Sequence, residues 1–366
     1  MSIIGLEATR ANRKDKTGTE WYAWHLLEQF KKIDKNNKFI VYYNKTLVGD
    51  IKSCPTNFIL RQLKWPFRKL WTHLRLSFEL IFNPVDKFFA SNAVPLFTRG
   101  EVTVTVHDLG FFRQPKLYHP LEKIYHKVSH RLAITRANKI IAVSQATAND
   151  IIKYFPKVKN KIKVIYNGWD QEKFKPVSEE IKTQIKNKYN LPAKFILYIG
   201  RIETKKNIQN LVKAFALLKD TDYHLVLAGR PGNFGYEEIL ALTKQEEIKD
   251  RIHLLGYVEA EDYQKLIAAT NFFIFPSKFE GFGIPILEAM GCGVPVLSSD
   301  IPVLKEVGGK AAIYFNPNQP QDIADKLDNF ITDRQLQVEM INYGKEQAVK
   351  FSWTKCAQET LDYILE

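Results

Sequence analysis

The chain has 366 residues, of which 45% are hydrophobic and 25% are charged. This length predicts two domains, each able to bury its own core, and the composition excludes a disordered or fibrous protein. Three scattered cysteines without metal-type spacing exclude a disulfide-rich domain and indicate a reducing compartment. The first residues, MSIIGLEATR, lack the basic region of a signal peptide, and no apolar run approaches membrane-spanning length.

The net charge of +13 is unevenly distributed along the chain. Residues 1–172 hold 29 Lys and Arg against 14 Asp and Glu, a net charge of +15, whereas residues 173–366 hold 24 against 26, a net charge of −2. This asymmetry predicts that the first half faces an anionic partner, either a membrane surface or a polyanion. A lysine-rich composition without functional meaning is the alternative, but it does not account for the uneven distribution.

The first half alternates apolar strands with amphipathic helices, a pattern typical of a parallel sheet. The first strand is expected at Ile3–Ala8, and a polar, basic loop follows it. A helix is expected to begin near Glu20, with Gly18 in the loop before it.

Residues 57–82 combine aromatic, aliphatic and basic side chains in one segment. If the segment is helical from Pro66, its apolar residues form one stripe with a basic fringe. The stripe contains Phe67, Leu70, Trp71, Leu74 and Phe78, and the fringe contains Arg61, Lys64, Arg68, Lys69 and Arg75. Such a helix can lie in a membrane interface, although a stripe of this kind more often packs on its own domain.

The next strand is expected at Val102–Val106, where valines and threonines alternate. His107 follows directly, at the edge where open α/β sheets bind their ligands, and could hydrogen-bond a ligand hydroxyl or a phosphate oxygen. A strand-end histidine satisfied by the backbone is the alternative. Asp108 is expected to order the loop that follows, and Ser144 to cap the helix that begins beside it.

The second half opens with the buried strand Phe195–Gly200. Arg201 and Lys206 follow in the turn, at a spacing that lets both cations reach one pyrophosphate. Fixed cations in this place lower the barrier to a reaction in which negative charge builds on a departing phosphate. Surface ion-pair partners are the alternative interpretation of these two residues.

Residues 275–300 contain a strand end, a glycine-punctuated loop and a helix that Pro285 is suited to begin. The loop presents backbone N–H groups at a helix N-terminus, where the helix dipole favours an anion. Glu280 precedes the loop and Glu288 lies in the helix, and a carboxylate can accept hydrogen bonds from two neighbouring hydroxyls. A phosphate cradle with two such acceptors predicts a nucleotide-sugar ligand, whereas an ordinary loop with surface glutamates is the alternative.

The stretch Glu280–Glu288, E-GFGIPIL-E, resembles the signature of the family 4 retaining glycosyltransferases. The family's G-R-x4-K pattern matches at Arg201 and Lys206, and its V-x-V-H-D-L pattern matches around His107. The resemblance covers nearly the whole chain and is weakest from residue 9 to about residue 100. It implies the GT-B architecture: an α/β chain of two Rossmann-like parallel-sheet domains facing each other across a cleft, with a C-terminal helix that crosses back to the first domain.

The resemblance also implies domain limits and site residues. It places an acceptor-side domain at residues 1–172, with residues 351–366 packing back on it, and a nucleotide-sugar-binding domain at residues 173–350. The implied catalytic residues are Glu280, Arg201, Lys206 and His107, and the implied donor-binding residues are Gly18, Phe282, Gly283, Ile284, Glu288, Tyr257 and Val258. Gly18 departs from the glycine-rich run frequent in the family, so an ordinary loop glycine is the alternative there.

We therefore expect a retaining hexosyltransferase that moves a mannose- or glucose-type sugar from a nucleoside diphosphate to a hydroxyl of a glycan or lipid-linked glycan, as in cell-surface polysaccharide synthesis. No metal or other cofactor is expected, because Arg201, Lys206 and the loop N–H groups can handle the pyrophosphate. Asp220-Thr221-Asp222 has the letters of a metal motif but is expected in a turn. The expected location is cytoplasmic, with a peripheral contact of the basic half to the inner face of the plasma membrane as a further option.

Two other classes of protein stay open. A basic nucleic-acid-binding α/β protein without transferase activity is suggested by the charge of the first half, but no recognition helix, zinc motif or single-strand-binding motif is present. A Rossmann oxidoreductase would need a G-x-G-x-x-G turn after its first strand, which the chain lacks.

Overall fold

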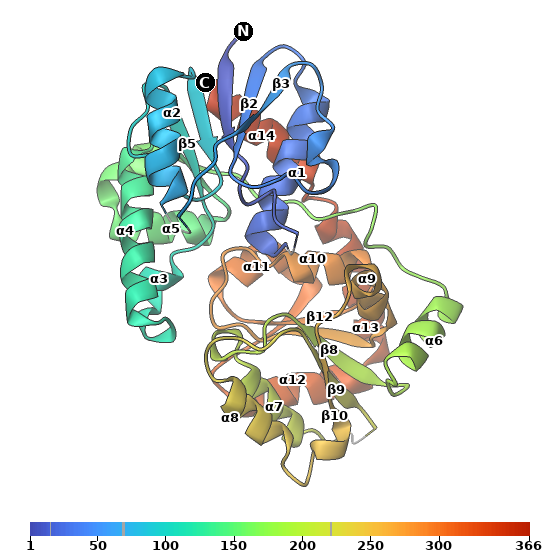
Figure 1. Cartoon of the computed structure of the whole chain (residues 1–366). Helices are drawn as coiled ribbons and strands as arrows, with labels where there is room; N and C mark the ends of the chain where they lie inside the picture. The colour runs from blue at the N-terminus through green and yellow to red at the C-terminus, as the bar shows by residue number, and fades with distance from the viewer. Residues whose placement is uncertain (15, 68–69, 220–221) are drawn as a thin grey trace. The chain divides into compact units, whose positions relative to one another are not determined.

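The structure is a computed structural model of the chain, and it describes all residues except 15, 68–69 and 220–221 (Figure 1). The basic residues at 68 and 69 and most of the Asp220-Thr221-Asp222 stretch thus lie outside the described residues. The chain divides into two compact units, Met1–Gly168 with Ser352–Glu366, and Trp169–Phe351. The sequence-based limits at 172 and 350 differ from these by a few residues. Trp169 belongs to the second unit, where its indole N–H donates to the Ala348 carbonyl at 2.8 Å.

The first unit contains a seven-stranded parallel sheet in the order β3-β2-β1-β4-β5-β6-β7. Its strands are β1 (Ile3–Glu7), β2 (Lys38–Tyr43), β3 (Phe58–Gln62), β4 (Lys87–Ala90), β5 (Glu101–Val106), β6 (Lys139–Ala142) and β7 (Ile162–Val164). Its α-helices are α1 (Gly18–Ile33), α2 (Leu76–Phe82), α3 (Gly110–Arg113), α4 (Pro120–Arg136), α5 (Gln145–Tyr154) and α14 (Trp353–Leu365). The alternation of strands and helices predicted from the sequence is confirmed.

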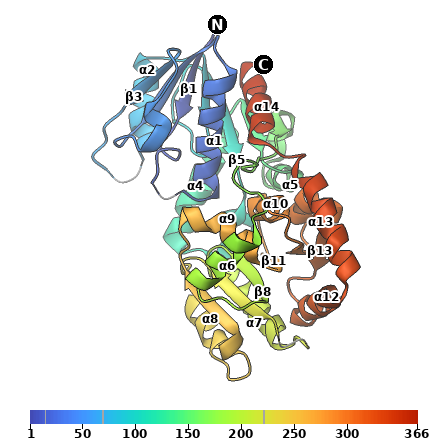
Figure 2. The ribbon, with the colours of Figure 1, turned by 90° about the vertical axis from the view of Figure 1, so that its right-hand side faces the viewer.

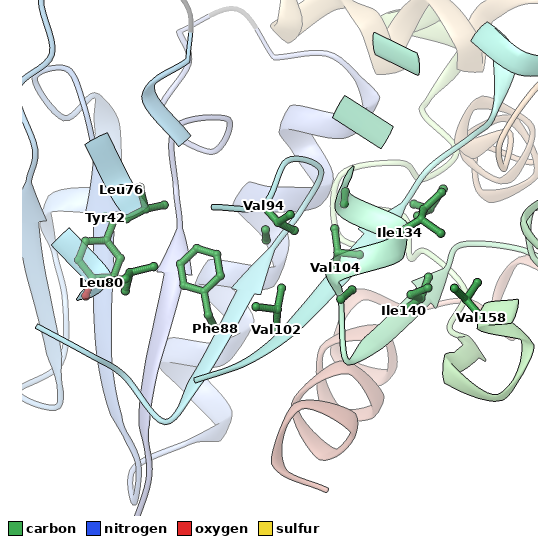
Figure 3. Close-up of a cluster of buried hydrophobic side chains, with 14 of the residues drawn as sticks. Tyr42, Leu76, Leu80, Phe88, Val94, Val102, Val104, Ile134, Ile140 and Val158 are labelled. Atoms are coloured by element: carbon green, nitrogen blue, oxygen red, sulfur yellow. The ribbon is translucent and has the colours of Figure 1, made fainter. Parts of the chain in front are cut away.

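Helices cover both faces of this sheet, as the neighbouring residues Phe88 and Phe89 of β4 show. Successive strand residues point to opposite faces, and both phenylalanines are buried. Phe88 joins a core cluster with Leu76 of α2 and Ile134 of α4 (Figure 3). The ring of Phe89 lies 6.2 Å from the ring of Phe30 in α1. Burial on both faces explains why the central strands consist mainly of apolar residues.

The C-terminal helix α14 belongs to the first unit and lies beside α1 (Figures 1 and 2). His25 of α1 stacks on Trp353 of α14, with ring centroids 4.6 Å apart and planes 10° apart. At the other end of α14, the Tyr363 hydroxyl donates to the Lys161 carbonyl at 2.7 Å. The predicted return of the C-terminal helix to the first domain is therefore confirmed.

The segment 57–82 differs from the single stripe expected from the sequence. Its first part is β3, and its later part is a π-helical turn at Trp71–Arg75 that continues into α2. Trp71 is buried and its indole N–H donates to the Leu63 carbonyl at 2.8 Å, whereas the other residues of the predicted stripe are exposed, so the stripe does not form one face. The segment is apolar on two sides, and only one side packs on the sheet.

The second unit contains a six-stranded parallel sheet in the order β10-β9-β8-β11-β12-β13. Its strands are β8 (Phe195–Ile199), β9 (His224–Ala228), β10 (Ile252–Gly256), β11 (Phe272–Phe275), β12 (Val296–Ser299) and β13 (Ala312–Phe315). Its α-helices are α6 (Glu179–Lys188), α7 (Ile208–Ala216), α8 (Tyr236–Thr243), α9 (Ala260–Ala269), α10 (Ile284–Gly291), α11 (Pro302–Gly308), α12 (Pro320–Thr332) and α13 (Arg334–Ala348). The strand order reverses between β8 and β11. Open parallel sheets bind ligands outside the carboxyl ends of the strands at such a reversal.

Candidate functional site

Three glycines follow or end the strands on one side of the reversal in the second sheet. Gly200, Gly229 and Gly256 lie at the carboxyl ends of β8, β9 and β10, and all have positive φ angles. A Cβ atom on Gly229 would lie 1.7 Å from the carbonyl oxygen of Gly200. Because the two backbones approach too closely for any side chain, the loops that leave these strands start from fixed positions.

The loop after β8 carries the two predicted cations. Arg201 is exposed, and its side chain makes no hydrogen bond or ion pair with the other residues that the structure describes. The Tyr198 hydroxyl donates to the Arg201 carbonyl at 2.8 Å and fixes the backbone there. Lys206 ends a short 3₁₀ turn, and Asn207 then takes a left-handed conformation with φ 62°. Buried Asn207 donates to the Pro317 carbonyl at 2.7 Å, so the turn that orients Lys206 is anchored in the core.

The loop after β11 leads into α10 through Gly283, which has φ 103°. The backbone conformation requires glycine, and a Cβ atom on Gly283 would lie 2.7 Å from Leu304 Cδ2, so the end of that side chain would also have to shift. The helix begins at Ile284, one residue before the predicted Pro285. Phe282 is buried and its ring lies 5.7 Å from that of Phe351, so only the backbone of Phe282 is available to a ligand.

Lys206 and Glu280 connect the two loops directly. Lys206 Nζ lies 2.5 Å from Glu280 Oε1, and the two side chains are 19% and 13% exposed. A charge-assisted contact of this kind in a partly buried place is stronger than a surface ion pair. Two residues 74 positions apart in the chain, both predicted as catalytic, therefore meet where the strand order reverses.

Glu288 lies on α10 and is held by a residue of α9. The Tyr263 hydroxyl donates to Glu288 Oε2 at 2.9 Å. Burial raises the pKa of Glu288 to about 7, against the opposing effects of the Tyr263 hydrogen bond and the Lys173 charge, while Asp170 raises it further. The carboxyl group therefore changes its charge near neutral pH. Tyr263 was not predicted from the sequence, because nothing in a lone helical tyrosine indicates a partner 25 residues away.

Tyr257 and Val258, two of the residues predicted to bind the donor, differ in exposure. Tyr257 follows β10, is 48% exposed and has the Arg230 guanidinium carbon 4.2 Å from its ring centroid. Val258 is buried, so it can offer only its backbone. A planar ring beside a guanidinium at a strand end is suited to stacking on an aromatic base.

His107 and Gly18 belong to the first unit. His107 Nε2 lies 3.0 Å from the Ser91 carbonyl, which can only accept, so Nε2 carries the proton and Nδ1 is an acceptor. Burial, with a smaller contribution from Arg10, lowers the pKa of His107 to about 4, so the ring is neutral at pH 7. The Asp108 carboxylate accepts the Gly110 N–H at 2.7 Å, which confirms its predicted role in ordering the loop.

Gly18 is the first residue of α1, and a Cβ atom there would meet no atom within 4 Å. Packing within the first unit therefore does not explain a glycine at this position. Beside it, buried Glu20 forms ion pairs with Arg10 at 3.0 Å and Arg13 at 3.4 Å. This cluster was missed in the sequence, although the spacing of Thr17 and Glu20 is that of a capping box.

No three His, Cys, Asp or Glu side chains of the described part gather in a group that could hold a metal ion. Within the same ranges, the structure contains no helix with the length and apolar character needed to cross a bilayer.

Comparisons with known proteins identify both units. The model of "Glycosyltransferase Family 4" matches residues 18–173, and that of "Glycosyl transferases group 1" matches residues 179–347. The O-antigen chain mannosyltransferase B of Escherichia coli is 33% identical over 263 residues, which cover 70% of this chain and 68% of the relative. The serotype-specific mannosyltransferase WbdA of Escherichia coli is 34% identical over 233 residues, which cover 62% of this chain but only 28% of the relative.

Among solved structures, Anabaena Alr3699/HepE in complex with UDP and glucose superposes with a TM-score of 0.78 at 19% identity, covering 100% of both chains. This similarity shows the shared GT-B fold of two parallel-sheet α/β units. The predicted fold and the predicted family are thus confirmed: the chain belongs to the family 4 glycosyltransferases, with a group 1 glycosyl transferase domain in its second unit.

Proposed function

We propose that the protein transfers a hexose from a nucleoside-diphosphate sugar to a hydroxyl of a glycan or lipid-linked glycan during synthesis of a cell-surface polysaccharide. Mannose is the favoured sugar, because the relatives with the matches described above are named mannosyltransferases. The proposal rests on the contact between Lys206 and Glu280 at the reversal of the second sheet, with Arg201 in the same loop after β8 as Lys206. Arg201 and Lys206 can bind a diphosphate through their positive charges, and the Glu280 carboxylate can accept hydrogen bonds from sugar hydroxyls.

The Lys206–Glu280 contact explains how donor binding would prepare the site. When a diphosphate reaches Lys206, it competes with Glu280 for the ammonium group. Glu280 is then released to accept hydrogen bonds from hydroxyls of the transferred sugar. Arg201 can grip two phosphate oxygens at once, whereas Lys206 acts as a point charge. Both cations oppose the negative charge that grows on the leaving diphosphate, and each is expected to lower the barrier by a few kcal/mol.

We further propose that the reaction retains the anomeric configuration and needs no metal. The bond between the anomeric carbon and the diphosphate oxygen breaks, and the acceptor oxygen bonds to the same face of that carbon. The acceptor proton passes to an oxygen of the departing diphosphate. Glu280 orients the sugar in this scheme and forms no covalent bond. Neutral His107, with Nδ1 as an acceptor, would hold a hydroxyl of the sugar rather than donate a proton.

The first test is a thermal-shift panel with UDP-, GDP- and ADP-sugars, followed by a transfer assay with the stabilising donor. A ligand well above its dissociation constant stabilises the protein by a few kcal/mol.

Arg201→Ala, Glu280→Ala and Glu288→Ala should each lose most of the transfer while remaining folded. Wild-type turnover in all three variants would exclude this site.

The mechanism has two separate tests. Proton NMR of the first-formed product should show the anomeric configuration of the donor, and an inverted product would rule out retention.

Addition of a chelator should leave the rate unchanged. A rate that a chelator abolishes and a divalent cation restores would contradict metal independence.

We also propose that the first unit contacts an anionic membrane on its cytoplasmic side, where a lipid-linked acceptor would be anchored. Phe67, Phe78 and Phe82 of segment 57–82 are between 62% and 68% exposed. The same unit holds 30 Lys and Arg against 15 Asp and Glu. Exposed aromatic rings on a cationic surface are typical of interfacial binding. Absence of co-sedimentation with anionic vesicles at moderate salt would exclude this contact.

A further inference from the structure

Tyr263 does more than pack between two helices, because its hydroxyl group makes a hydrogen bond to Glu288. It donates to Glu288 Oε2 at 2.9 Å from α9 to α10. The Tyr263 ring packs edge-on against Phe174 with centroids 5.7 Å apart, so the ring is held from a second side. Burial and the neighbouring Glu288 charge raise the pKa of Tyr263 well above its usual value, so the hydroxyl remains a hydrogen-bond donor at any physiological pH.

We propose that Tyr263 is a positioning residue that holds the Glu288 carboxylate to bind the ribose hydroxyls of the nucleotide donor. The inference rests on the proposed function and on the donor-binding role that the family resemblance implies for Glu288, and it adds the residue that prepares Glu288 for that role. Tyr263 occupies Oε2, and Oε1 has no hydrogen-bond partner among the described residues, so Oε1 is the oxygen that can accept from the ligand. The Tyr263 hydroxyl thus makes the site favour a ribonucleotide over a deoxynucleotide.

Two physical effects give this hydrogen bond its importance. A free glutamate loses rotamer entropy when a ligand fixes it, and Tyr263 has already fixed it before the ligand arrives. The second effect is electrostatic, because burial disfavours the charged form of Glu288. A neutral carboxyl group is a poorer acceptor of hydroxyl hydrogen bonds than a carboxylate. The Tyr263 hydrogen bond favours the carboxylate and therefore opposes this loss.

The groups facing Glu288 come from three elements, and Glu288 is the group whose pKa is raised to about 7. Tyr263 comes from α9, and Lys173 and Asp170 come from the segment before α6. Cys292 follows α10, and burial raises the pKa of its thiol to about 12. Donor binding should therefore weaken as the pH falls from 8 to 6, because Glu288 takes up a proton.

A matched control lies in the same unit. The Tyr189 hydroxyl donates to Asp262 Oδ2 at 2.8 Å, so Tyr189 also binds a carboxylate of α9. Asp262 has no proposed part in donor binding, and Lys188 also contacts it at 2.6 Å. If Tyr263 only ties helices together, then Tyr263→Phe and Tyr189→Phe should have similar effects on nucleotide binding.

The experiment compares Tyr263→Phe, Tyr189→Phe, Glu288→Gln and the wild type by calorimetry. The probes are the nucleoside diphosphate selected by the donor panel (UDP, GDP or ADP) and its 2′,3′-dideoxy counterpart, from pH 6 to pH 8.5. Tyr263→Phe should bind the ribonucleotide roughly 3- to 10-fold more weakly and the dideoxynucleotide equally well. The KM for the donor should rise by the same factor with kcat within twofold, and the apparent pKa of binding should rise.

The double variant Tyr263→Phe/Glu288→Gln should bind no more weakly than Glu288→Gln alone, because the two residues act as one unit. Equal losses for both nucleotides, or an equal loss in Tyr189→Phe, would overturn the role of Tyr263. Additive losses in the double variant would do the same. If Glu288→Gln itself bound the ribonucleotide like the wild type, the proposed role of Glu288 would fail and not merely that of Tyr263.

Discussion

Each unit contains its own parallel sheet, and in both sheets the strand order reverses near the centre. The surfaces of the two units nevertheless differ in net charge and in the exposure of apolar side chains. The first unit has a net charge of +15 and exposes several phenylalanines, whereas the second has a net charge of −2. In the second unit, Lys206 and Glu280, which are 19% and 13% exposed, contact each other between two loops. Residues that act on a bound molecule must be held in place by fixed partners. A surface that binds a membrane needs only a positive charge and exposed apolar area. This difference is the one expected between the proposed site for chemistry and the proposed surface for membrane attachment.

The largest expected effect lies in the second unit. Lys206→Ala should lower kcat by about 100-fold or more, because a fixed cation at the leaving diphosphate is lost. Lys205→Ala is the matched control: Lys205 lies one position earlier, with Nζ 5.7 Å from the Phe279 ring centroid, and its loss should change kcat by less than about threefold. Radiolabelled sugar transfer measures both variants. Equal losses in the two lysine variants would mean that general charge, and not the contact with Glu280, governs the reaction.

The sequence predicted the second unit better than the first, for a physical reason. Glu280–Glu288 is one continuous stretch, and the requirement for glycine at Gly283 is a local property of the backbone. The Lys206–Glu280 contact became visible only when the reversal of strand order brought two loops together. The stripe of segment 57–82 was predicted as one face, but Trp71 is buried while Phe67 and Phe78 are exposed, because the side of a helix that is buried depends on the sheet it packs against. Periodicity alone carries no such information.

The next largest effect is expected in the first unit and concerns its binding to membranes. Phe78 and Phe82 are exposed, and their rings lie 4.8 Å apart. Phe78→Ser/Phe82→Ser should weaken binding to anionic vesicles by roughly 10-fold or more, because partial burial of each ring in lipid contributes about 1 kcal/mol. Val338→Ser is the control, since Val338 is 59% exposed on the second unit. Vesicle co-sedimentation measures the effect, and transfer to a water-soluble acceptor should be unchanged. Equal weakening in the control variant would show that exposed apolar area anywhere on the chain has the same effect.

The smallest effect concerns the free energy of unfolding and tests whether the buried Glu288 of the second unit destabilises the folded state. The folded pKa of Glu288, about 7, lies above its ordinary value of 4.5, so the folded state disfavours the carboxylate. The free energy of unfolding should therefore fall as the pH rises from about 4.5 to about 7, because the native state holds a proton that the unfolded state has lost. Glu288→Gln cannot ionise and should be more stable than the wild type by about 1–2 kcal/mol at pH 8. This corresponds to a rise in Tm of a few degrees that vanishes near pH 4. A variant with the same Tm as the wild type at both pH values would mean that Glu288 is solvated, and its proposed dependence on Tyr263 would lose its electrostatic basis.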